Sequence, residues 1–216
     1  MNPDYQIKNV KLYNIDCMEF MKNIPDNYYD LAVVDPPYGI GQIKNNLHGE
    51  IKWNDNVPDD SFFVELKRIS KHQIIWGVNY FNNLQGGRII WNKLLTPKNK
   101  KTFSHCEIAY CSLQKRTTIV NYQWSGNVQN GSINWKNNGA DSRIHPTQKP
   151  IDLYRWLLTN YAKEGFKIFD SHGGSFSSAC ACLDMGFDFD GCEIDREYFD
   201  NAVERLKNNV QDYLEF

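Results

Sequence analysis

The residues best suited to chemistry in this chain are Asp35-Pro36-Pro37-Tyr38, which directly follow an apolar run. Residues 30–34 read Asp-Leu-Ala-Val-Val and predict a buried strand, so the tetrapeptide begins at its carboxyl end. Ligands of open α/β sheets bind outside such ends, and paired prolines offer carbonyls without N–H groups. A carboxylate, a carbonyl and an aromatic ring predict a site for a planar amine such as a nucleobase. A rigid turn without chemistry is the alternative.

The tetrapeptide resembles the catalytic signature of the amino-methyltransferases, which move a methyl group from S-adenosylmethionine to an exocyclic nitrogen. Two later segments carry the same resemblance, His145-Pro146-Thr147-Gln148-Lys149-Pro150 and the glycine turn Asp170-Ser171-His172-Gly173-Gly174-Ser175. Their order along the chain resembles that of beta-class DNA amino-methyltransferases of bacteria and phages. The resemblance extends from Tyr13 to Tyr198. It implies a circularly permuted, Rossmann-like α/β fold with a mostly parallel seven-stranded sheet.

The pattern from residue 166 to 193 predicts a cofactor site of βαβ type. A strand at 166–170 leads into the glycine turn, a helix over 176–185 and a second strand over 187–192. Glycines allow the backbone to approach a ligand, and Glu193, at the end of the second strand, is placed to bind ribose hydroxyls. One departure bears on cofactor affinity, because Phe176 stands where the family's commonest turn has glycine.

The resemblance assigns further residues to S-adenosylmethionine. Asp16 is expected at the adenine end, although capping of a helix at 17–23 explains it equally well. His172 is a candidate contact, with a surface turn histidine as the favoured alternative. The full predicted cofactor set is Asp16, Asp35, Thr147, Gln148, Lys149, Asp170, His172, Gly173, Gly174, Ser175 and Glu193.

The expected activity is methylation of adenine N6 in double-stranded DNA, because the family usually pairs an opening aspartate with adenine. The target base would be flipped out of the duplex and stacked on Tyr38. Cytosine N4 is the alternative amine, and a nucleic-acid-binding module without catalysis is the alternative class. A homodimer and a restriction enzyme partner are both compatible with the resemblance.

Composition limits the class of protein. The 216 residues suffice for one domain, and 41% hydrophobic with 23% charged residues is typical of a soluble globular protein. No apolar run approaches the ~20 residues of a membrane span, and the polar start has no signal-peptide core. We therefore expect a cytoplasmic protein. The six scattered cysteines lack zinc-site spacing, so we expect buried thiols and no metal.

Charge and polarity divide the chain into segments. Residues 67–149 hold 13 lysines and arginines against two acidic residues, while the remainder carries a net charge of −13. This basic segment could contact phosphates. Within it, the polar stretch at about 113–144 predicts a target-recognition insertion, with a surface hairpin as the alternative. Residues 39–60 predict a mobile loop that closes on substrate, with an ordinary surface loop as the alternative.

The remaining pattern predicts a helix over 61–70, capped by Asp60 or Ser61, and strands over 73–77, 88–92 and 107–112. Asn79 and Tyr80 follow the first of these strands. We expect them at the same sheet edge as the tetrapeptide, lining the pocket for the target base.

Overall fold

The structure, a computed structural model, describes residues 1–39, 56–82, 84–94, 104–125, 128–130, 144–145 and 147–214. The elements of the first half are β1 (Tyr5–Ile7), β2 (Val10–Tyr13), α1 (Cys17–Met21), β3 (Tyr29–Val34), α2 (Asp60–Ile69), β4 (Ser70–Trp76), the 3-10 helix η1 (Val78–Tyr80), β5 (Gly87–Asn92) and β6 (Cys106–Cys111). The second half contains β7 (Thr117–Asn121), β8 (Gln123–Ser125), β9 (Val128–Asn130), α3 (Ile151–Tyr161), β10 (Lys167–Asp170), α4 (Ser177–Met185), β11 (Asp188–Cys192) and α5 (Arg196–Leu214).

One sheet runs through the described part of the chain in the order β1-β2-β11-β10-β3-β4-β6-β5-β7. Five of its eight neighbouring pairs are parallel, which confirms a mostly parallel α/β sheet. The expected number of seven strands is corrected to nine. β1 extends one edge by an antiparallel hairpin with β2, and β7 extends the other edge beside β5.

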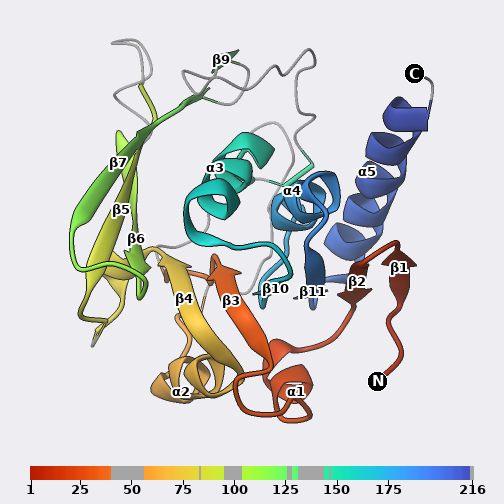
Figure 1. Cartoon of the computed structure of the whole chain (residues 1–216), viewed down its shortest axis with the longest axis horizontal. Coiled ribbons are helices and arrows are strands. Elements are labelled where there is room, and N and C mark those ends of the chain that lie inside the picture. The colour runs from red at the N-terminus through yellow and green to blue at the C-terminus, as the bar shows by residue number, and fades with distance from the viewer. Residues whose placement is uncertain are drawn as a thin grey trace.

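Helices cover both faces of the sheet. Figure 1 shows α1 and α2 on one face and α3, α4 and α5 on the other. Each face has its own apolar core, one built on α1 and α2 residues such as Phe20 and Leu66, the other on α3 to α5 residues such as Leu157 and Ala179. Burial on both faces explains why the predicted strand before Asp35 is continuously apolar. Residues 31–34 of β3 are at most 1% exposed.

Local signals placed α1, α2 and α4 within about two residues, whereas α5 was not predicted. The amphipathic pattern of α2 is confirmed, because Phe62, Leu66 and Ile69 are all buried. Its N-cap is Asp59, whose carboxylate accepts a hydrogen bond from the Ser61 N–H. The predicted cap, Asp60 or Ser61, is one or two residues further along the chain. A short polar side chain in extended backbone ahead of the first turn is the ordinary geometry of such a cap.

The two predicted special segments lie only partly within the described residues. Of the loop at 39–60, residues 40–55 lie outside them. The segment at 113–144 does not begin as a separate insertion, because β7 pairs in parallel with β5 and extends the main sheet. Val120, Tyr122 and Trp124 belong to the main core. β8 and β9 then form a separate two-stranded sheet, and residues 131–143 lie outside the description.

None of the helices described here is both long and apolar enough to cross a membrane.

Candidate active site

The parallel strands β11, β10, β3 and β4 are neighbours, so their carboxyl ends share one edge of the sheet. Asp35 follows β3, Gly77 follows β4, the glycine turn follows β10 and Glu193 follows β11. The predicted catalytic tetrapeptide and the predicted cofactor turn are thereby brought to adjacent strand ends. This is the place where open α/β sheets bind ligands.

Asp35 is held by two protein donors. The Tyr38 hydroxyl donates to its Oδ1, and the Lys149 ammonium donates to its Oδ2. Burial raises the pKa of the Asp35 carboxyl, and the Lys149 charge only partly opposes this. Between Asp35 and Tyr38 in the sequence, Pro36 is buried and Pro37 is half-buried. The carboxylate is therefore oriented before any ligand binds.

Glu107 joins this site although the sequence analysis did not single it out. It lies on β6, and its Oε2 is 3.0 Å from the Lys149 Nζ while its Oε1 is 2.6 Å from the Lys93 Nζ. Burial acts to raise the pKa of Glu107, but these two ammonium groups outweigh burial and lower the pKa to about 2. A sequence signal did exist, because Glu107 is one of only two acidic residues in the basic segment 67–149.

Tyr38 packs in an aromatic group next to Asp35. Its ring lies so close to Gly77 that a Cβ there would be 2.1 Å from a ring carbon, and Gly77 has a φ of +75°. Only glycine tolerates both conditions. The Tyr38 ring stacks on Tyr80, with centroids 5.0 Å apart and planes 12° apart. Tyr80 is 42% exposed, so this member of the stack reaches solvent.

The glycine turn is tied to the end of β11 by two backbone N–H groups. Gly173 N–H donates to the Cys192 carbonyl at 2.8 Å, and Gly174 N–H donates to the Glu193 Oε2 at 2.7 Å. The Asp195 N–H holds the other oxygen of Glu193 at 2.8 Å. Burial raises the pKa of Glu193. The carboxylate is thus fixed against the turn at the end of β11.

Phe176 takes the position of the missing glycine without unfolding the turn. Its φ is +51°, the left-handed region that favours glycine, and its side chain is fully buried. The ring fills space left by Gly173 and Gly191, where an added Cβ would be 2.1 Å and 2.5 Å from it. It points into the core beneath the turn, beside Phe189 and Phe199. The two glycines thereby accommodate the substitution.

Asp170 and His172 are more enclosed than a surface turn requires. Asp170 is 1% exposed, accepts from Ser178 Oγ at 2.6 Å and from the His172 N–H at 3.1 Å, and burial raises its pKa to about 7. The expectation of a surface histidine is wrong, because His172 is half-buried against Phe62 and Cys17. Burial lowers the His172 pKa to about 4 and raises the Cys17 pKa to about 12. These directions leave both groups neutral, so they are not an activated thiolate–imidazolium pair.

The hexapeptide contacts both halves of the site. Thr147 bonds to the His145 Nδ1 through its N–H at 3.3 Å, and Gln148 is buried and accepts from the Ile144 N–H at 3.0 Å. The carbonyl of Lys149 accepts from Ser177 Oγ at 2.6 Å, at the start of α4. Ser175 is also buried here. The segment therefore joins the glycine turn to Asp35.

Asp16 caps α1, as one of its two interpretations predicted. Its Oδ1 accepts from the N–H groups of Met18 at 2.8 Å and Glu19 at 3.1 Å. Two neighbours escaped the sequence analysis. Asn14 donates to the Glu193 carbonyl at 2.8 Å, and Ile194 exposes 64% of its surface beside Glu193.

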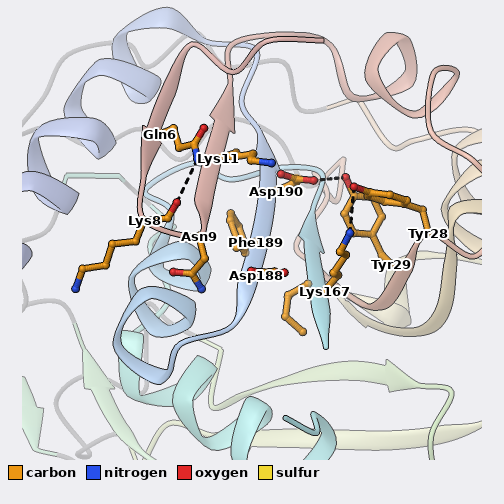
Figure 2. A pocket seen from close by; sticks show the side chains of 11 residues that line it. Gln6, Lys8, Asn9, Lys11, Tyr28, Tyr29, Lys167, Asp188, Phe189 and Asp190 are labelled. Carbon is orange, nitrogen blue, oxygen red and sulfur yellow. Dashed lines mark hydrogen bonds between the residues drawn. The ribbon is translucent and has the colours of Figure 1, made fainter. Parts of the chain in front are cut away.

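A depression of about 260 Å3 lies at the opposite edge of the sheet from these residues. Figure 2 shows its wall, where Lys167 donates to the Tyr28 hydroxyl and Asp190 accepts from Tyr29. Lys167 and Asp188 are the first residues of β10 and β11. None of the predicted site residues lines this depression.

Within the described ranges no group of three His, Cys, Asp or Glu side chains could hold a metal ion. All six cysteines are free, five of them buried. Cys106, the first residue of β6, is exposed, contrary to the expectation of six buried thiols.

The mostly parallel sheet, with polar side chains gathered at the carboxyl ends of its strands, is the architecture of DNA methyltransferases of known structure. Solved structures share the fold. The M1.HpyAVI complex with SAM superposes with a TM-score of 0.61 at 18% identity, covering 91% of this chain and 99% of that one. The cytosine-N4-specific PvuII DNA methyltransferase gives 0.63 at 13% identity, covering 98% and 94%.

The chain belongs to the N6/N4 DNA methylase family, because that family model, described as DNA methylase, matches residues 58–204. It is 26% identical to the type II methyltransferase M.HinfI of Haemophilus influenzae, over 89% of this chain and 67% of the relative. It is 24% identical to the DNA adenine methyltransferase YhdJ of Escherichia coli (strain K12), over 88% and 80%. Membership confirms the resemblance seen in the sequence, and with it S-adenosylmethionine as the cofactor.

Proposed function

We propose that this protein methylates the N6 amine of adenine in double-stranded DNA. The observation that carries the proposal is the Asp35 carboxylate, held by Tyr38 and Lys149 at the end of β3, one strand away from the glycine turn after β10. The adenine assignment rests on the opening aspartate of the tetrapeptide. The similarity to the DNA adenine methyltransferase YhdJ supports it.

Asp35 can act on an amine although both of its oxygens already have partners. A carboxylate offers about four lone-pair sites, and Tyr38 and Lys149 use two of them. Asp35 and the Pro36 carbonyl would accept the two N–H bonds of the target amine. That arrangement favours a pyramidal nitrogen, with its lone pair directed away from both acceptors. Asp35 is also placed to take the proton that the methylated nitrogen releases.

The described residues fit S-adenosylmethionine, which when bound supplies an electrophilic methyl group. This cofactor is a cation with a ribose, and three enclosed carboxylates, Asp35, Asp170 and Glu193, meet at this edge. Glu193 and the exposed Ile194 would hold the ribose and the adenine ring. We propose that Thr147, Gln148, Ser175 and His172 shape the remainder of the site.

The basic segment contributes less free charge than its composition suggests. Arg68, Lys71, Lys93 and Lys149 are engaged in ion pairs with acidic side chains. Phosphate contacts therefore fall to other members, such as Lys115 and Arg116 beyond β6. We propose that the polar part of 113–144 beyond β7 reads the base sequence, and that 39–60 closes on substrate. DNA as substrate also implies a cytoplasmic enzyme, and a homodimer or a restriction partner stays compatible with it.

The test is to incubate the purified protein with S-adenosylmethionine and mixed-sequence DNA, digest to nucleosides and separate the products by mass spectrometry. N6-methyladenine is the expected product. N4-methylcytosine alone would overturn the adenine assignment and keep the role of Asp35. No methylated nucleoside on any DNA, with the cofactor still bound, would favour a binding module without catalysis.

A further inference from the structure

Four charged side chains form an alternating row behind the tetrapeptide. Asp35, Lys149, Glu107 and Lys93 follow one another, with Lys149 Nζ 3.0 Å from Glu107 Oε2 and Lys93 Nζ 2.6 Å from Glu107 Oε1. The Lys149 side chain is only 4% exposed. A charge buried to that degree is stable only when it is paired. The row ends at Asp35, the member that faces the proposed base site.

The ammonium of Lys149 is already committed to oxygens of the protein. Lys149 Nζ donates to the Asp35 carboxylate and, at 3.3 Å, to the Tyr38 hydroxyl, and the Glu107 Oε2 lies 3.0 Å away as an ion-pair partner. Contact with the cofactor, which the sequence analysis expects of Lys149, would need an N–H group directed away from these three oxygens. The backbone carbonyl of Lys149, by contrast, does face the cofactor turn through Ser177.

We propose that Lys149 is a positioning residue for Asp35, held in place by Glu107, and not a ligand of the cofactor. This inference rests on the proposed function, because it concerns how Asp35 meets the target amine. Lys149 occupies one side of the carboxylate and Tyr38 the other. The remaining lone pairs of Asp35 are therefore confined to the direction of the base.

Glu107 determines how much of the Asp35 negative charge is left to act on the target amine. Lys149 alone would neutralise Asp35 and weaken its attraction for an amine that becomes positive during methylation. Glu107 shares the Lys149 charge, so Asp35 keeps a negative field on its open side. Glu107 forms ion pairs with both Lys93 and Lys149, whereas Asp35 pairs with Lys149, which it shares with Glu107. The pKa of Glu107 is accordingly lowered while burial keeps the pKa of Asp35 raised, which leaves Asp35 the more basic carboxylate.

The charged and titratable groups around Asp35 come from several elements. Lys149 precedes α3, Glu107 lies on β6 and Tyr38 follows β3, and all three act on the Asp35 pKa. Tyr154 of α3 and Asp170 of β10 also interact with Asp35 electrostatically. Of these, Lys149 is the cation, and Glu107 is the carboxylate that contacts it. Removing Lys149 should raise the Asp35 pKa, and removing Glu107 should lower it.

The experiment compares Lys149→Met, Glu107→Gln and wild type. Aspartate carboxyl carbons are labelled with carbon-13, and the Asp35 signal is assigned by its loss in Asp35→Asn. Lys149→Met should raise the titration midpoint of Asp35 by roughly one to three pH units, and Glu107→Gln should lower it. Lys71→Met is the matched control, because it breaks the 2.7 Å ion pair with Asp30, away from the site. It should leave the Asp35 midpoint unchanged.

Activity and cofactor binding supply two further measurements. The acid limb of the single-turnover methylation rate should follow the Asp35 midpoint in each variant, and Lys149→Arg should restore part of the rate. Calorimetry should show cofactor affinity largely unchanged in Lys149→Met.

The inference is overturned by an affinity loss of about tenfold or more with an unmoved Asp35 midpoint, which would return Lys149 to the cofactor site. If Lys149→Met does not fold, Glu107→Gln alone decides, because an unchanged or raised midpoint contradicts the proposal. A wild-type protein that methylates no DNA would refute the proposed function, whereas the titrations judge the charge row independently.

Discussion

Replacing Asp170 with asparagine should stabilise the cofactor-free protein, and the gain should depend on pH. Asp170 is 1% exposed at the end of β10. Burial raises its pKa from 3.8 to about 7, and hydrogen bonds from Ser178 and the His172 N–H offset only part of the cost of ionising it. Above neutral pH the folded protein must therefore carry a poorly solvated charge. Asparagine keeps the shape of the side chain and cannot ionise.

The sign and size follow from linkage. Because the folded pKa is raised, the stability contributed by this group is present at low pH and is lost as pH rises toward 7. Each pH unit between the unfolded and folded pKa is worth about 1.4 kcal/mol. The variant should therefore gain about 3 kcal/mol in free energy of unfolding, relative to wild type, between pH 5 and pH 8. A constant offset from altered hydrogen bonds to Ser178 does not change this slope.

Urea unfolding of both proteins at pH 5, 6, 7 and 8, without cofactor, measures the difference directly. Asp200→Asn, on the exposed face of α5, is the control for removing an acidic side chain elsewhere in the protein. The reasoning fails if Asp170→Asn differs from wild type by the same amount at every pH, since Asp170 would then titrate alike in the folded and unfolded chains.

Three further substitutions separate the proposed roles. Glu193→Ala should weaken cofactor binding by roughly 1.5–3 kcal/mol, the worth of a charge-assisted hydrogen bond; unchanged affinity in calorimetry would remove Glu193 from the site. Asp35→Ala should abolish methyl transfer and leave cofactor binding mostly intact, and parallel loss of both would make Asp35 structural. Tyr38→Ala should weaken binding of an extrahelical base by roughly 1–3 kcal/mol, measured with DNA carrying a fluorescent base analogue. Tyr80→Ala should have a smaller effect in the same assay, and no effect of either change would deny the stacking role.

Much of the site could be predicted because its signals are local. The apolar run of β3 and the turn residues after it place Asp35 at a strand end without knowledge of any other segment. The glycine turn and Glu193 likewise lie within a single βαβ unit, where Gly174 and Glu193 are brought together by one helix and one strand. The amphipathic faces of α2 and α3 also depend only on neighbouring residues.

Other predictions failed or stayed open because their outcome depends on distant contacts. The sequence predicts an insertion at about 113–144, which includes β7, since these residues have no long helical or strand period. The place of β7 in the sheet comes from pairing with β5 and from the burial of Val120 against the main core. Similarly, Asp16 suited a cap and a cofactor contact equally, and only coordinates show the two N–H groups that it accepts.

Residue types and short-range order thus determined the family, the parallel sheet and the edge at which chemistry should occur. The tertiary structure alone decided which charges meet there. Lys149 is 114 residues from Asp35 in the chain. Glu107, which contacts Lys149, lies on β6, distant from both of them along the sequence. No pattern encodes such a contact locally, because it exists only after β3, β4 and β6 pair side by side and exclude water from the charges between them.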